Sequence, residues 1–247
     1  MVRIDAAAYA CRWQGVAPSA KGLFALAGIV AAWISRSPGV LALLALMSAL
    51  ATLAGARVPL RTYFAVALAP LGFLSLSCLT MVLTPATGGG WQWTPSLLPK
   101  VSVIALRSLA VMTAVLGLML TTPMPDLLLL LRRLRAPELL LDMMALSYRM
   151  LFVLRQAWDE GSTAQAARLG HRGWRQSWRS MGLLAGQMAV QVWQRASALQ
   201  AAADARAWQG SLRFLPASFP NARREVALAL LAGAMLLALA LGDWLWA

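Results

Sequence analysis

Residues 101–121 read VSVIALRSLAVMTAVLGLMLT, a run of 21 residues in which Arg107 is the single charged side chain. A helix needs about 20 mostly apolar residues to cross the hydrocarbon core of a bilayer. The composition of the whole 247-residue chain fits such a segment, because 60% of its residues are hydrophobic and 13% are charged. Soluble domains normally carry about 25% charged residues. The sequence therefore predicts an integral membrane protein.

Four other apolar segments accompany this run. Residues 62–84 and 226–246 are long enough to cross a bilayer, whereas residues 22–34 and 39–56 are shorter. The turn SRSPG at 35–39 separates the two shorter segments. Each shorter segment crosses with tilt or local thinning of the bilayer, or the two form a shallower hairpin. We expect an all-α membrane protein with about five transmembrane helices.

The basic residues predict the orientation of the chain. With the N-terminus in the cytoplasm, 19 of the 22 Lys and Arg residues fall on the cytoplasmic side, and Arg36 and Lys100 fall outside. Basic residues favour cytoplasmic loops, so this orientation is preferred. Arg107 remains inside a span, where it must face protein, water or headgroups. The sequence does not identify its partner.

Three segments follow from this topology. Residues 1–121 form an N-terminal transmembrane region, residues 122–222 lie in the cytoplasm, and residues 223–247 form the last span. The cytoplasmic segment contains two long amphipathic helices, expected from 138 to about 168 and from about 176 to 208. Apolar positions on one face of the second helix recur at helical spacing; they are Leu184, Met188, Val192, Leu199 and Ala203.

The two cytoplasmic helices end in similar sequences, AQAARLG at 164–170 and AADARAWQG at 202–210. Each contains Ala-Arg, and Gly170 and Gly210 stand where a helix often ends on a left-handed glycine. An arginine in the last turn stabilises the helix dipole, and near a membrane it binds anionic headgroups. Alternatively, each arginine forms a bidentate ion pair with a carboxylate of a partner protein, and the small alanines allow that partner to approach.

The connector ARLGHRGWRQSWR at 167–179 holds four arginines and the chain's single histidine, His171. Trp174 and Trp178 are four residues apart in the same stretch. Arginine beside aromatic rings also binds single-stranded nucleic acid, but a basic, tryptophan-rich segment next to a bilayer is more simply an anchor in the membrane interface. We therefore expect no nucleic-acid partner.

The sequence offers no catalytic or metal-binding constellation. Cys11, Cys78 and His171 are isolated from one another, so they make no set of metal ligands. Asp159 and Glu160 are adjacent and point in different directions on a helix, which favours surface charges. With no glycine-rich phosphate loop, we expect neither a cofactor nor ATP binding on this chain.

The order of these features resembles the T components of energy-coupling factor (ECF) transporters over almost the full chain. Within that family the chain looks most like the CbiQ type of cobalt importers, or its nickel counterpart. The stretches that carry the resemblance are IDAAAY at 4–9, the pattern from Pro18 to Lys21, LSYRMLFVL at 146–154, AARLGHRGW at 166–174 and ARAWQGSLRFL at 205–215.

The resemblance implies a role for the two helix ends. In the family each motif is an Ala-Arg-Gly-like tripeptide that docks into a groove on one of two cytoplasmic ATPase subunits. The matching residues here are Ala167, Arg168 and Leu169, and Ala205, Arg206 and Ala207. Both third positions depart from glycine, which puts a close backbone approach there in doubt and leaves the arginines unaffected.

The family also implies the overall function. The chain would be a non-catalytic coupling subunit in the bacterial inner membrane that transmits the motion of the ATPases to a separate, membrane-embedded substrate-binding subunit. The alternatives are the T component of a vitamin importer, an intramembrane enzyme, or a membrane scaffold without ATPase. Cobalt and nickel are not distinguished by this chain, because recognition of the ion lies on another subunit.

Overall fold

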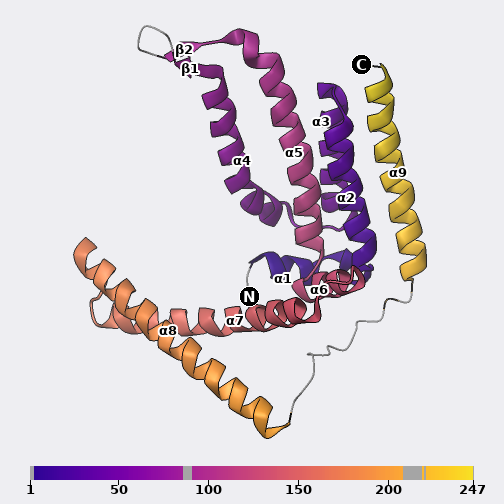
Figure 1. Ribbon diagram of the computed structural model, residues 1–247. Coiled ribbons are helices and arrows are strands. Elements are labelled where there is room, and N and C mark those ends of the chain that lie inside the picture. The colour runs from indigo at the N-terminus through magenta and orange to yellow at the C-terminus, as the bar shows by residue number, and fades with distance from the viewer. Residues whose placement is uncertain (1–2, 86–90, 208–218, 220, 247) are drawn as a thin grey trace. The chain divides into compact units, whose positions relative to one another are not determined.

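A computed structural model describes residues 3–85, 91–207, 219 and 221–246 (Figure 1). Helices make up nearly all of it, and one short antiparallel hairpin of two strands joins the second and third long spans. In chain order the elements are α1 Arg3–Ala10, η1 Arg12–Gly15, α2 Pro18–Ile34, α3 Pro38–Leu50, η2 Ala51–Gly55, α4 Leu60–Val82, β1 Leu83–Pro85, β2 Trp91–Trp93, η3 Pro95–Leu97, α5 Leu98–Thr121, α6 Met124–Arg133, α7 Glu138–Ala167, α8 Trp174–Ala205 and α9 Ala222–Trp246.

Four helical segments are long and apolar enough to cross a membrane. They are Pro38–Gly55, Leu60–Val82, Pro95–Thr121 and Ala222–Leu245. The first reaches this length because the π-helical turn η2 continues α3. The remaining apolar helix, α2, has 17 residues and is shorter. The prediction of an all-α membrane protein is confirmed, whereas the short strands β1 and β2 were not predicted from the sequence.

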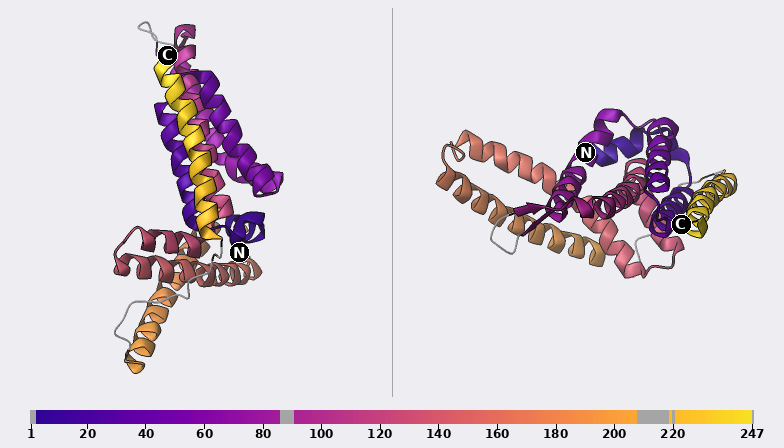
Figure 2. Two further views of the ribbon diagram at one scale, coloured as in Figure 1. Left: turned by 90° about the vertical axis from the view of Figure 1, so that its right-hand side faces the viewer. Right: turned by 90° about the horizontal axis from the view of Figure 1, so that it is seen from above.

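The membrane helices pack closely where small residues meet. Helix α5 contacts α2, α3 and α4, and α9 runs along α2 (Figure 2). A Cβ atom on Gly233 of α9 would lie 2.9 Å from the Cβ of Ala27 on α2, and one on Gly28 would lie 3.4 Å from the Cβ of Ala114 on α5. Small residues at such interfaces let helix backbones approach, which is the usual basis of helix association in lipid.

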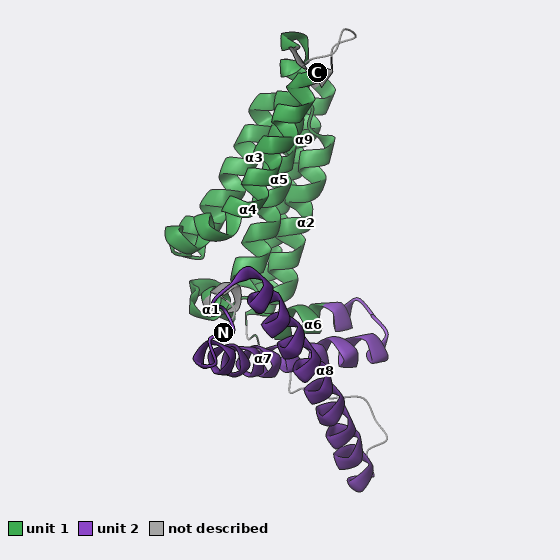
Figure 3. Cartoon of the chain, turned by 90° about the vertical axis from the view of Figure 1, so that its left-hand side faces the viewer, with its two compact units in different colours: residues 1–130, 216–247 green, residues 131–215 purple. Residues whose placement is uncertain are grey.

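The chain divides into two compact units, coloured separately in Figure 3. Unit 1 comprises residues 1–130 and 216–247 and holds all the candidate spans. Unit 2 comprises residues 131–215 and consists mainly of α7 and α8. These are the two long helices expected from the sequence, and their observed ends lie within three residues of the predicted ones.

Candidate functional site: two arginine helix ends

Arg168 occupies the C-cap position of α7, and the chain turns away from the helix directly after it. The amide of Leu169 donates to the carbonyl of Ala166 at 3.0 Å, and the amide of Gly170 donates to the carbonyl of Gln165 at 2.8 Å. These two bonds form a Schellman motif, which satisfies the last carbonyls of a helix. The Arg168 side chain is exposed to solvent at this end.

Arg206 occupies the same position at the end of α8. Its amide donates to the carbonyl of Ala203 at 3.1 Å, and the amide of Ala207 donates to the carbonyl of Asp204 at 3.0 Å. Arg206 is exposed, as is Ala205 before it. The two Ala-Arg motifs thus share one local backbone geometry.

The third residue of each motif adopts a left-handed backbone conformation, with φ of 58° at Leu169 and 48° at Ala207. This region favours glycine, because a Cβ atom there crowds the following carbonyl. The prediction that Gly170 takes the left-handed position is wrong, because Leu169 takes it one residue earlier. Gly210 lies outside the described residues. The geometry accounts for the glycine of the Ala-Arg-Gly pattern, and this chain accepts strain at both sites.

Gly170 has a different role, which depends on its lack of a side chain. The Ser180 hydroxyl, on the second turn of α8, donates to the carbonyl of Gly170 at 3.0 Å in a buried contact. A Cβ atom on Gly170 would lie 2.5 Å from Ser180 Oγ and 2.9 Å from the carbonyl oxygen of Gln165. The connection from α7 to α8 is therefore tightly closed just behind Arg168.

Helix α8 separates the two arginines. It contains 32 residues, so at 1.5 Å per residue it is about 48 Å long. Arg168 precedes its start by six residues and Arg206 directly follows its end. In the part of the chain that the structure describes, neither guanidinium forms an ion pair. Both are therefore available to carboxylates of another protein.

Helices α7 and α8 meet near the connector and diverge beyond it. The Leu184 side chain, which is 4% exposed, contacts the backbone of α7 at Gly161. Farther along, a groove of about 700 Å³ opens between the helices. Val192, Leu199 and Ala203 line this groove. The apolar face predicted for α8 is thus buried at Leu184 and open to solvent at its other end.

The groove combines an apolar floor with a basic rim. Arg149 of α7, Arg195 of α8 and Arg206 at the end of α8 contribute to its lining, and none of the described residues that line it is acidic. Large apolar side chains are also exposed elsewhere on these helices; they include Leu139, Met143, Leu151, Leu183, Val190 and Trp193. Exposed apolar surface of this extent is typical of a protein that binds a partner.

The connector presents its aromatic residues to the outside. Trp174 is 79% exposed and Trp178 is 60% exposed, and their rings pack edge to face with centroids 5.6 Å apart. Arg172, Arg175 and Arg179 are exposed around them. This arrangement fits either an interface anchor or a protein contact.

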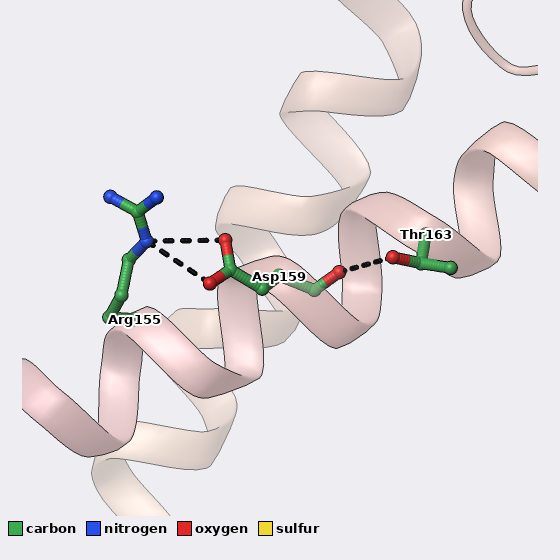
Figure 4. A network of polar contacts seen from close by, with 3 residues as sticks. All are labelled: Arg155, Asp159 and Thr163. Atoms are coloured by element: carbon green, nitrogen blue, oxygen red, sulfur yellow. Dashed lines mark hydrogen bonds and ion pairs between the residues drawn. The ribbon is translucent and has the colours of Figure 1, made fainter. Parts of the chain in front are cut away.

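The acidic pair on α7 consists of surface charges, as the sequence predicted. Arg155 Nε lies 3.2 Å from both carboxylate oxygens of Asp159, and the Thr163 hydroxyl donates to the Asp159 carbonyl at 2.7 Å (Figure 4). Gln156 donates to Glu160 at 2.8 Å. The Arg155 and Asp159 side chains are 76% and 59% exposed, and such pairs stabilise a helix only slightly.

The structure supplies the partner of Arg107 that the sequence left open. Its Nη2 atom donates to the carbonyl oxygen of Ser35 at 2.9 Å, and its guanidinium carbon lies 5.9 Å from the centroid of the Trp33 ring. Arg107 therefore joins α5 to the end of α2. Two further charged residues of unit 1 have partners that the sequence does not reveal: Lys21, which belongs to the family pattern at 18–21, and Asp243.

The fold and these helix ends define a class: a multi-pass helical membrane protein that carries a separate unit of two long helices. The family model described as "CbiQ: Cobalt transport protein" matches residues 12–215. The chain therefore belongs to the CbiQ family, which confirms the resemblance to a CbiQ-like T component of ECF transporters.

Relatives agree with this assignment over most of the chain. The cobalt transport protein CbiQ of Rhodobacter capsulatus is 35% identical over 221 residues, which cover 88% of this chain and 90% of that protein. CbiQ of Salmonella typhimurium is 28% identical over 224 residues, which cover 85% of this chain and 98% of that protein. A putative fused cobalt transport protein, CbiMQ, of Methanocorpusculum labreanum is 28% identical over 222 residues, which cover 85% of this chain and 37% of that protein.

Proposed function

We propose that this chain is the transmembrane coupling subunit of an ECF-type importer of cobalt ions. Two cytoplasmic ATPase subunits hydrolyse ATP, a separate membrane subunit binds the ion, and this chain transmits motion between them without a catalytic role of its own. Membership of the CbiQ family supports the transport function, as do three relatives named as cobalt transport proteins.

One observation carries the proposal: two helix ends of the same geometry present exposed arginines about one α8 length apart. At about 48 Å this spacing exceeds the roughly 30 Å diameter of a small domain. Arg168 and Arg206 are therefore suited to contact two different ATPase subunits. Because one continuous helix lies between them, movement of either anchor is carried along α8.

The chemistry of the anchors favours a protein partner with carboxylates. A guanidinium forms planar, bidentate hydrogen bonds with a carboxylate, and such charge-assisted bonds are roughly twice as strong as neutral ones. Ala167 and Ala205 are exposed and small, so another backbone can approach each arginine closely. The exposed apolar faces of α7 and α8 supply the surface for the substrate-binding subunit.

The fused relative supports a second membrane chain beside this one. Because this chain matches 37% of the CbiMQ protein, most of that protein is additional sequence covalently joined to its CbiQ part. In the present system we propose that a separate chain supplies the corresponding part and binds the cobalt ion.

Co-purification tests the two-anchor proposal. Arg168→Glu combined with Arg206→Glu should lose far more ATPase association than either single change, because one remaining anchor still holds the complex. Truncating one partner of a buried charge pair typically costs about 2–5 kcal/mol. Arg61→Glu with Arg155→Glu is the matched control, since it changes the net charge equally at exposed positions that do not line the groove. Wild-type association in the double variant, or equal loss in the control, would overturn the proposal.

Uptake of radioactive cobalt by the reconstituted complex tests the substrate. Cobalt uptake that depends on ATP and resists an excess of nickel supports the assignment. Uptake of nickel in preference to cobalt would transfer the proposal to the nickel branch, and uptake of a vitamin instead of either ion would overturn it.

A further inference from the structure

Lys21 is a buried cation at the point where several helices of unit 1 converge. It lies in the first turn of α2 and is 5% exposed. Its Nζ atom donates to the carbonyl oxygen of Thr121, the last residue of α5, at 2.8 Å. A cation at a helix C-terminus interacts favourably with the helix dipole and with carbonyls that lack helical partners. Lys21 thus ties the beginning of α2 to the end of α5.

The segment after α1 and helix α6 also pack at this point, the first against the Thr121 carbonyl and the second against Gly22, the residue after Lys21. Cys11, which follows α1, lies with its Sγ 3.8 Å from the Thr121 carbonyl oxygen. A Cβ atom on Gly22 would lie 3.0 Å from Cδ2 of Leu130, so α6 packs against the bare backbone of α2 directly beside Lys21. Partial burial raises the pKa of the Asp126 carboxyl on α6, and the Lys21 ammonium opposes that shift.

The last span reaches the same turn of α2 from the other end of the chain. Glu225, in the first turn of α9, accepts a hydrogen bond from the amide of Ala17 at 2.7 Å through its Oε2 atom. Ala17 is the N-cap of α2. An anion at a helix N-terminus satisfies a free amide and complements the dipole. Helix α9 is therefore fixed to α2 four residues before Lys21.

These contacts matter because of where the chain passes between its two units. It leaves unit 1 after Leu130 and returns at residue 216. The outgoing connection runs through α6, whose Leu130 packs on Gly22, and the returning connection leads into α9, whose Glu225 caps α2. Both covalent links therefore end on elements that are attached to the first turn of α2.

We propose that the first turn of α2, with Lys21 as its positioning residue, is the joint through which movement of unit 2 is delivered to the membrane helices. This inference rests on the proposed coupling function. Lys21 keeps the end of α5 seated on α2, so displacement of α6 or α9 moves α2 and α5 together. Without the ammonium, α2 still follows α6 and α9, but α5 is no longer held to α2.

The test compares Lys21→Met with Lys21→Arg in the complete reconstituted complex. Methionine keeps the length of the side chain but removes its charge and donors, whereas arginine retains both. Lys21→Met should keep ATPase association and ATP hydrolysis while metal uptake per ATP falls about five-fold or more, the scale of a typical coupling free energy. Lys21→Arg should restore the ratio. The proposal is overturned if ATP hydrolysis and metal uptake fall in parallel, or if metal uptake per ATP hydrolysed does not change.

If the Lys21→Met chain does not assemble with its partners, a second variant tests the same proposal. Leu130→Ala loosens α6 on Gly22 and leaves the hydrogen bond between Lys21 and Thr121 in place, so it should lower uptake per ATP in the same way; an unchanged ratio overturns the joint. The wild-type chain is tested first for co-purification of the ATPase subunits. If it retains none, the proposed coupling function is wrong, and the comparison of the Lys21 variants is not needed to show it.

Discussion

Asp243 in the last turn of α9 accepts a hydrogen bond from the Ser35 hydroxyl at 2.7 Å, across 208 residues of sequence. The same Oδ2 atom accepts hydrogen bonds from the backbone amides of Arg36 at 2.8 Å and Ser37 at 2.9 Å. Ser37 is the N-cap of α3, so one carboxylate at the end of the last span fixes the turn between α2 and α3. Arg107 donates to the carbonyl of Ser35 and completes the attachment of this turn.

Asp243→Asn should weaken this attachment. The amide keeps one acceptor oxygen but loses the negative charge that favours the three donors, so we expect a loss of about 1 kcal/mol, the usual scale for a helix cap. Thermal unfolding of the purified chain in detergent measures the effect. Lys100→Ala is the control, because it removes an exposed charged side chain of α5 and leaves the carboxylate and all three donors in place; an equal loss there would contradict the role of the carboxylate.

Sequence reasoning located the long helices but not these contacts. The hydropathy of a segment depends only on its own residues. The apolar runs of the sequence therefore predict the membrane helices to within about four residues of their observed ends. The partners of Arg107 and Asp243 are far away in sequence, so no local pattern identifies them. The two arginine ends were found because Ala-Arg recurs, whereas the left-handed residue was placed on Gly170 by propensity. In the structure Arg168 is the C-cap of α7, so the left-handed position that follows the cap falls on Leu169.

Leu169→Gly should stabilise the end of α7, because glycine adopts the left-handed conformation without the cost of about 1 kcal/mol or more that a Cβ atom incurs. Ala207→Gly should do the same for α8. Gly170→Ala is the opposing control: its methyl group would meet Ser180 Oγ and the Gln165 carbonyl oxygen, so it should destabilise. Slower amide exchange in the last turns of the helices would support the first two expectations, and faster exchange would contradict them.

Site-directed labelling tests the predicted orientation, with the N-terminus inside and the C-terminus outside. In a background with Cys78→Ser, a cysteine at Ser96 should react with an impermeant reagent added from outside. A cysteine at Ser177 should react only after the cytoplasmic side is opened. Ser96 is exposed in η3, which makes it a suitable reporter. Reaction of residue 177 from outside would contradict the topology that the basic residues predict.

The last prediction concerns a tight contact between α7 and α8. Leu184 packs against Gly161 with no room for a side chain there, so this contact fixes the angle at which the helices diverge. Gly161→Leu should force the helices apart and change the position of Arg206, at the far end of α8, relative to α7. Gly186→Leu is the matched control, because among the described residues no atom beyond its chain neighbours and the adjacent backbone of α8 lies within 4 Å of the Cβ position at Gly186.

Both substitutions replace glycine with a strong helix former, which alone favours the helix by up to about 1 kcal/mol. Any difference between them therefore reports packing and not propensity. We expect Gly161→Leu to insert into the membrane normally but to retain less ATPase on co-purification, while Gly186→Leu behaves as the wild type. If the two variants retain equal amounts, the divergence of α7 and α8 does not position the arginine anchors. In that case each helix end engages its partner independently of the other.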